Sequence, residues 1–145
     1  MDPAPEKLEK PASPFERKIA AAGFSAMTAG AGLVWYIDPA RASFMPACPL
    51  FITTGFACSG CGLTRGFHAL FHGDIVTSLE YNALIPVFIV VFGFFYVSMF
   101  LVAVRGYAFP RWTLSLPAVW GFLGLLLVFG IVRNIPAYPF TLLFP

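Results

Sequence analysis

Charged residues are scarce in this sequence, and long parts of it have none. Lys, Arg, Asp and Glu make up 11% of the 145 residues, whereas soluble domains contain about 25%. The ranges 19–37, 83–104 and 113–132 carry no charge. Each is long enough for a helix to cross a hydrocarbon core of about 30 Å. So few polar residues could not cover three apolar helices in water. The sequence therefore predicts an all-α, small integral membrane protein with three transmembrane helices.

Basic residues form no patch, and lysine is absent after Lys18. This pattern argues against a nucleic-acid partner, and the composition predicts the lipid bilayer as the partner instead. Residues 1–18 are rich in proline and charge, and we expect them to be a disordered tail. Residues 19–145 are then expected to form one membrane domain.

The basic residues are unequally divided between the two sides of this domain. Six fall on the side of the N-terminus and three on the other: Lys7, Lys10, Arg17, Lys18, Arg105 and Arg111 against Arg41, Arg65 and Arg133. The side with more Lys and Arg usually faces the cytoplasm. We therefore expect a cytoplasmic N-terminus and an outward-facing segment 38–82. The first apolar run is longer than the core of a signal peptide, about 7–15 residues, so we expect it to stay as a span.

Small residues recur at every fourth position of the first span, at Ala22, Ala26 and Gly30. This spacing places them on one face of a helix, where they allow another helix to approach closely.

Cysteine is also rare, and its three copies all lie between residues 48 and 61 in the pattern C-P-x8-C-x2-C. Both histidines follow shortly afterwards. After Gly62 the sequence becomes amphipathic with helical period. One face carries Leu63, Phe67, Leu70 and Phe71, and the opposite face carries Cys61, Arg65, His68 and His72. We expect Leu63–His72 to be a short interfacial helix between the first two spans.

The polar residues around this helix have simpler expected roles. Gly73 suits the C-terminal cap of the helix, and Asp74 suits the N-cap of the next one. Arg65 is expected to brace the loop or to bind lipid phosphate. Asn82, near the mouth of the second span, is expected to bond the backbone or Arg65.

Four roles for the cysteines stay open. In an oxidising outer compartment, Cys48 could form a structural disulfide with Cys58 or Cys61. The Cys58–Cys61 pair could perform thiol–disulfide exchange, with Cys61 the most reactive thiol because it lies near a helix start and Arg65. All three could bind zinc, joined by His68 or His72. Finally, the cysteines could serve only to shape the loop.

An ordered motif runs through this part of the sequence: Cys48-Pro49, Thr54-Gly55, Cys58-x-Gly60-Cys61-Gly62-Leu63-Thr64-Arg65, Gly73-Asp74 and Asn82. This motif resembles that of a bacterial membrane-protein family called domain of unknown function 2752. Arg133 and Pro136 also resemble an Arg–Pro pair near the family's C-terminus. Ser59 and Ala83 stand where the family pattern has proline, which removes two constraints on the backbone. The resemblance implies a small integral membrane protein of bacterial type and implies no activity. Together with the expected spans, it predicts a multi-pass protein of the bacterial inner membrane, and the cofactor stays unknown.

Two functions are compatible with these observations. The first is a non-enzymatic assembly component that docks another membrane protein, or a second copy of the chain, through the outward cysteine loop. The alternative is a membrane thiol-redox protein using Cys58 and Cys61, or a structural zinc site in the loop.

Overall fold

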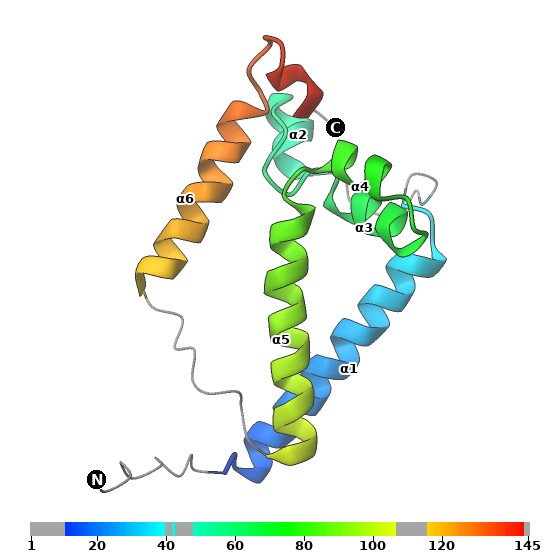
Figure 1. The fold of residues 1–145 in the computed structure, drawn as a ribbon, viewed down its shortest axis with the longest axis vertical. Helices are drawn as coiled ribbons and strands as arrows, with labels where there is room; N and C mark the ends of the chain where they lie inside the picture. Colours follow the sequence, from blue (N-terminus) through cyan, green and yellow to red (C-terminus); the bar gives the residue numbers. More distant parts are fainter. Residues whose placement is uncertain (1–10, 40–41, 43–47, 107–115, 144–145) are drawn as a thin grey trace, which may run out of the picture.

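The computed structural model describes residues 11–39, 42, 48–106 and 116–143. These residues form helices joined by short turns, with no β-strand among them (Figure 1). The elements are α1 (Pro14–Tyr36), α2 (Pro49–Thr54), α3 (Leu63–Phe71), α4 (Ile75–Tyr81), α5 (Ile85–Arg105), α6 (Leu116–Val132) and the 3₁₀ helix η1 (Phe140–Leu143). The expected all-helical class is confirmed for this part of the chain.

Helix α1 begins at Pro14, five residues before the expected start of the first span at Ile19. The Ser13 hydroxyl accepts from the Glu16 N–H at 3.2 Å, and a Glu16 carboxylate oxygen accepts from the Ser13 N–H at 2.7 Å. This capping box satisfies two N–H groups that the helix leaves free. Residues 14–18, expected in the tail, are therefore helical, whereas residues 1–10 lie outside the described part.

Within the described ranges, two helices have the length and composition of membrane spans, α1 with 23 residues and α5 with 21. No residue in the most apolar 18-residue window of α5 is buried within the chain, so α5 is not the core helix of a globule. Helix α6 is also apolar and has 17 residues. Residues 113–115 of the expected third span lie outside the described ranges. The short helix predicted at Leu63–His72 is present as α3, which ends at Phe71 and is separate from these long helices; its place at the membrane interface stays a prediction.

Helices α1 and α5 pack against each other near the start of α1 and the end of α5, and they diverge toward their other ends (Figure 1). The Phe24 ring lies 4.6 Å from that of Tyr96 and 5.4 Å from that of Phe100. Gly23 allows close approach, since a Cβ there would lie 2.7 Å from the Met99 sulfur. The contact thus uses a face other than the Ala22–Ala26–Gly30 stripe, whose three residues are exposed.

The small buried core lies where α3, α4 and the start of α5 meet. Gly66 of α3 is buried, and a Cβ on it would collide with Ile85 Cδ1 and lie 3.0 Å from the Ser78 carbonyl oxygen. Ser78, Asn82 and Ile85 are at most 1% exposed. This close contact fixes the α3–α4 hairpin on top of α5, and the hairpin positions the cysteine segment beside it.

Candidate three-cysteine site

The three cysteines converge although they come from two separate segments. Cys48 immediately precedes α2, whereas Cys58 and Cys61 lie in the turn before α3. The Sγ atoms of Cys48 and Cys58 are 3.3 Å apart, and those of Cys58 and Cys61 are 3.4 Å apart. All three sulfur atoms lie within 4.8 Å of one another, and all three cysteines are free thiols. Their proximity permits either thiol–disulfide chemistry or binding of a thiophilic metal.

Backbone hydrogen bonds distinguish the Cys48 thiol from the others. Cys48 caps α2, and the N–H of Phe51 lowers the pKa of its thiol to about 7, with further help from Cys58. A nearby N–H donor stabilises the thiolate and therefore favours proton loss.

The Cys61 thiol has the opposite tendency. Burial, together with hydrogen bonding to Cys58 and Cys48, raises the pKa of Cys61 to about 12. The sequence-based expectation that Cys61 is the most reactive thiol is therefore wrong in direction. Gly62, not Cys61, is the N-cap of α3, and its backbone is left-handed with φ 81°. Cys61 thus precedes the helix instead of lying in its first turn.

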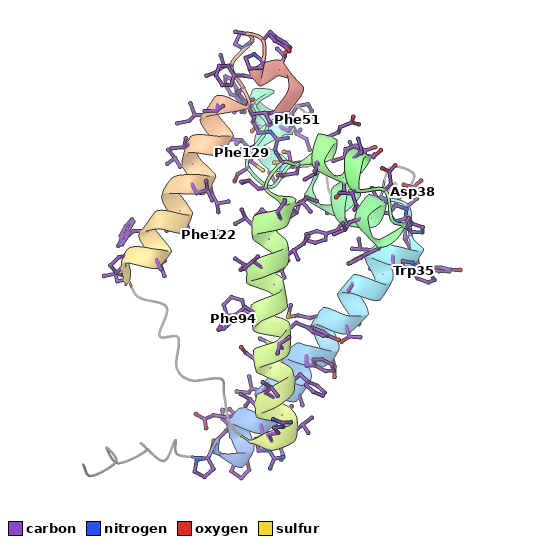
Figure 2. All side chains as sticks on the ribbon, viewed as in Figure 1. Trp35, Asp38, Phe51, Phe94, Phe122 and Phe129 are labelled. Carbon is purple, nitrogen blue, oxygen red and sulfur yellow. The ribbon has the colours of Figure 1, made fainter. Side chains whose placement is uncertain are left out.

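Arg133, which directly follows α6, binds the backbone of the cysteine turn. Its Nη1 donates to the carbonyl oxygens of Cys58 at 2.9 Å and Cys61 at 3.1 Å, and its Nε donates to that of Leu143 at 3.1 Å. Its guanidinium carbon also lies 5.2 Å from the ring centroid of Phe129, which extends from α6 near the cysteine segment (Figure 2). Arg133 is only 1% exposed, and its burial lowers the pKa of the guanidinium.

Two asparagines complete the support of this turn. Asn134 accepts from the Ala57 N–H at 2.8 Å and donates to the Ala57 carbonyl oxygen at 2.7 Å. Asn82 donates to the carbonyl oxygens of Ser59 at 2.8 Å and Cys61 at 3.1 Å. The backbone of residues 57–61 is therefore held by side chains that follow α6 and by Asn82, the C-cap of α4.

The histidines lie at a different place from the sulfur cluster. His68 Nδ1 is 2.6 Å from the Val34 carbonyl oxygen near the end of α1. The His72 ring stacks on Trp35, with centroids 6.1 Å apart, and lies 4.4 Å from the His68 ring. Figure 2 shows Trp35 at this end of α1, beside the α3–α4 hairpin. Neither histidine joins the group of sulfur ligands in the described residues.

The remaining predicted site residues have separate positions. Asp74 is the N-cap of α4, and its Oδ1 accepts from the Thr77 N–H at 3.0 Å, as the sequence predicted. Thr64 and Arg65 are exposed on α3. Asn82 bonds the backbone, which was one of its two predicted partners, and the structure shows no bond from it to Arg65.

Residues 48–96 match the family model described as a protein of unknown function, DUF2752. This segment is a DUF2752 domain. The match begins at Cys48, covers the cysteine turn, α3 and α4, and ends within α5. No curated protein and no solved structure matches the chain.

The structure explains how the turn tolerates one departure from the DUF2752 motif, at Ser59. Where Ser59 replaces the motif's proline, Asn82 donates a hydrogen bond to the carbonyl oxygen of Ser59, so the turn keeps a fixed backbone.

The supporting role of Asn134 was missed by the sequence analysis. Its only sequence signal is its place next to Arg133, because its partner Ala57 is 77 residues away.

Proposed function

We propose that this chain is a three-span protein of the bacterial inner membrane with a cytoplasmic N-terminus. In this proposal the protein is a non-enzymatic assembly component, and its outward-facing cysteine segment docks another membrane protein. The observation that carries the proposal is the locked backbone of residues 57–61, held by Arg133, Asn134 and Asn82. A surface whose backbone is already ordered loses less conformational entropy when a partner binds.

Apolar side chains protrude from the residues that precede this locked turn, on α2 and just after it. Leu50, Phe51 and Ile52 of α2 are 45%, 44% and 68% exposed, and Phe56 is 57% exposed. Helix α2 lies with η1 at one end of the molecule, at the top of Figure 1. An exposed apolar patch on an ordered segment is typical of an interaction site, and its chemistry fits an apolar helix at the membrane surface.

The unused stripe on α1 supports association within the membrane as well. Ala22, Ala26 and Gly30 are exposed, and a Cβ on Gly30 would meet nothing within 4 Å. Small residues at this spacing allow helix backbones to approach closely. In this proposal the helix that packs against these three residues belongs to the docked protein or to a second copy of the chain.

Site-specific photo-crosslinking in native membranes tests this function. A photoreactive amino acid is placed at Ile52 in the proposed surface and, as a matched control, at Val90 of α5, which is 72% exposed. We expect a discrete protein adduct from position 52 and lipid adducts from position 90. Lipid adducts alone from position 52 would show that this surface contacts lipid and no protein, which would contradict the docking proposal.

Thiol–disulfide exchange is the second candidate, and the central position of Cys58 favours it. Cys58 lies 3.3 Å and 3.4 Å from its two neighbours, so it could form a disulfide with either. Attack of the Cys48 thiolate on a Cys58–Cys61 disulfide would form the Cys48–Cys58 bond and release the Cys61 thiolate, which takes up a proton. Mapping disulfides by mass spectrometry across redox buffers would detect both pairs if this exchange occurs.

A further inference from the structure

The three sulfur atoms define a triangle small enough to surround one metal ion. Two of the Sγ separations are 3.3 and 3.4 Å, and all are within 4.8 Å. Thiolates bound at about 2.3 Å around a tetrahedral ion lie about 3.8 Å apart. Movements of a fraction of an ångström would therefore bring the three sulfur atoms to the geometry of a metal site.

A metal ion would use every cysteine of the cluster, whereas one disulfide would leave a thiol over. The cysteines come from two segments, and the turn carrying two of them is fixed by hydrogen bonds from Arg133 and Asn82 to its carbonyl oxygens. Hydrogen bonds to the backbone next to a metal-binding side chain hold that side chain in position and raise the affinity for the metal.

Arg133 supplies an independent observation, because it is a buried cation with no anionic hydrogen-bond partner among the described residues. It is 1% exposed, and its three hydrogen bonds are to neutral carbonyl oxygens. Its Nη2 is buried without any acceptor in the described part of the chain. Burying a charge is costly unless an opposite charge compensates it. The arrangement thus calls for negative charge beside the cysteine turn.

We infer that the three cysteines, as thiolates, bind one divalent ion of the zinc type, with Arg133 as the buried counter-charge. Three thiolates contribute −3, the divalent ion +2 and the guanidinium +1, so the half-buried centre is neutral. A monovalent copper ion would leave a net charge of −1, and charge balance beside the buried Arg133 therefore favours the divalent ion. Zinc binds sulfur ligands in tetrahedral sites and does not change its oxidation state.

The histidines are not part of this site. His68 is hydrogen-bonded to the Val34 carbonyl oxygen near the end of α1, and its ring packs against the His72 ring in a tilted arrangement. The described residues provide no fourth His, Cys, Asp or Glu ligand beside the three sulfur atoms, so the proposal leaves the fourth metal position open to water or another donor. The metal site goes beyond the docking proposal, and each can fail without the other.

Cobalt titration of the full-length protein in mild detergent tests the inference, because tetrahedral cobalt–thiolate centres absorb strongly in the near ultraviolet. The protein is first reduced and treated with chelator. We expect the charge-transfer band to saturate at one cobalt ion per chain and to disappear when zinc is added. Cys48→Ser, Cys58→Ser and Cys61→Ser should each weaken the band, and His68→Ala should keep it.

Arg133 needs a separate readout, because its loss could also loosen the fold. Arg133→Met removes the charge, and Arg133→Lys restores it on a similar stem. With helix content checked by circular dichroism, we expect the methionine variant to bind cobalt about 10–100-fold more weakly. The lysine variant should recover part of that loss.

Three results would overturn the inference. If reduced wild-type protein gives no cobalt–sulfur band, the protein has no such metal site. If the band survives intact in Cys48→Ser, the three cysteines are not the ligand set. If Arg133→Met binds cobalt as tightly as wild type, Arg133 is not the counter-charge of the site. Because all three measurements follow metal binding, they do not depend on the crosslinking result for docking.

Discussion

Arg133 donates a hydrogen bond to the carbonyl oxygen of Cys61 across 72 residues of sequence, at 3.1 Å. This bond links the end of α6 to the cysteine turn, which is otherwise joined to the hairpin of α3 and α4. Its neighbour Asn134 makes the second link, to Ala57. The cysteine geometry therefore depends on a helix outside the matched DUF2752 segment, residues 48–96.

Loss of the Asn134 amide should destabilise the protein. Asn134→Ala leaves the N–H and carbonyl of Ala57, which is 1% exposed, without their partner. An unsatisfied buried polar group costs about 1–3 kcal/mol, so the melting temperature in detergent should fall. Asn134→Asp is the matched control, because it keeps the oxygen acceptor and loses the donor. An unchanged melting temperature in the alanine variant would show that water replaces this link.

A methyl group at Gly66 should loosen the hairpin from α5. A Cβ there collides with Ile85 Cδ1 and lies 3.0 Å from the Ser78 carbonyl oxygen. Overpacking of this kind costs about 1–3 kcal/mol. Gly93→Ala is the control, because a Cβ there meets nothing within 4 Å, and alanine is the better helix former.

A double variant checks the cause of that loss. Ile85→Val removes the colliding Cδ1 atom, so Gly66→Ala should cost less when it is made in the Ile85→Val background. Additive unfolding free energies for the two changes would place the damage elsewhere.

Local features of this fold could be predicted from the sequence, whereas the long-range ones could not. Gly73 adopts φ 85° and Asp74 caps α4, and both signals lie within a few residues of the helix ends that they set. The links from Arg133 and Asn134 span 72 to 77 residues. Spacing contains no information about such distances, and the family resemblance alone drew attention to Arg133.

The thiol prediction failed for a similar reason. Cys61 is next to a helix in sequence, but the left-handed Gly62 separates it from the first turn. Cys48 was not expected to be favoured, because the short helix α2 that provides its N–H donor has no clear apolar period. Which thiol ionises first is thus decided by backbone direction over one or two residues, which composition does not reveal.

Acid should weaken the start of α4 through Asp74. The Thr77 hydroxyl and N–H lower the pKa of the Asp74 carboxyl. A pKa that is lower in the folded state means that the stabilising effect is present above the unfolded pKa and is lost as pH falls through the folded one. Melting temperatures of wild type and Asp74→Asn should therefore converge between about pH 5 and pH 2. Glu80→Gln on the same helix is the control, and a constant difference would contradict the capping role.

The proposed topology places the C-terminus on the outer side of the membrane. Six basic residues against three favour a cytoplasmic N-terminus, and three crossings bring the end of the chain to the opposite side. A reporter that is active only outside the cytoplasm, fused after Pro145, should therefore be active. The same reporter fused after Gly106, which follows α5, serves as the control and should be inactive. The reverse pattern would invert the topology.

Cys48 should be alkylated before Cys61 in the reduced, metal-free protein. The N–H of Phe51 lowers the pKa of Cys48 to about 7, whereas burial raises that of Cys61 to about 12. Near neutral pH a large fraction of Cys48 is thiolate and almost none of Cys61 is, and the thiolate is the nucleophile. Brief iodoacetamide treatment followed by peptide mass spectrometry should find the label on Cys48, with the rate rising most steeply around pH 7. Protein unfolded in denaturant is the control, in which both thiols should react at similar rates. Faster labelling of Cys61 in the folded protein would show that the short helix α2 does not direct its N–H groups at Cys48.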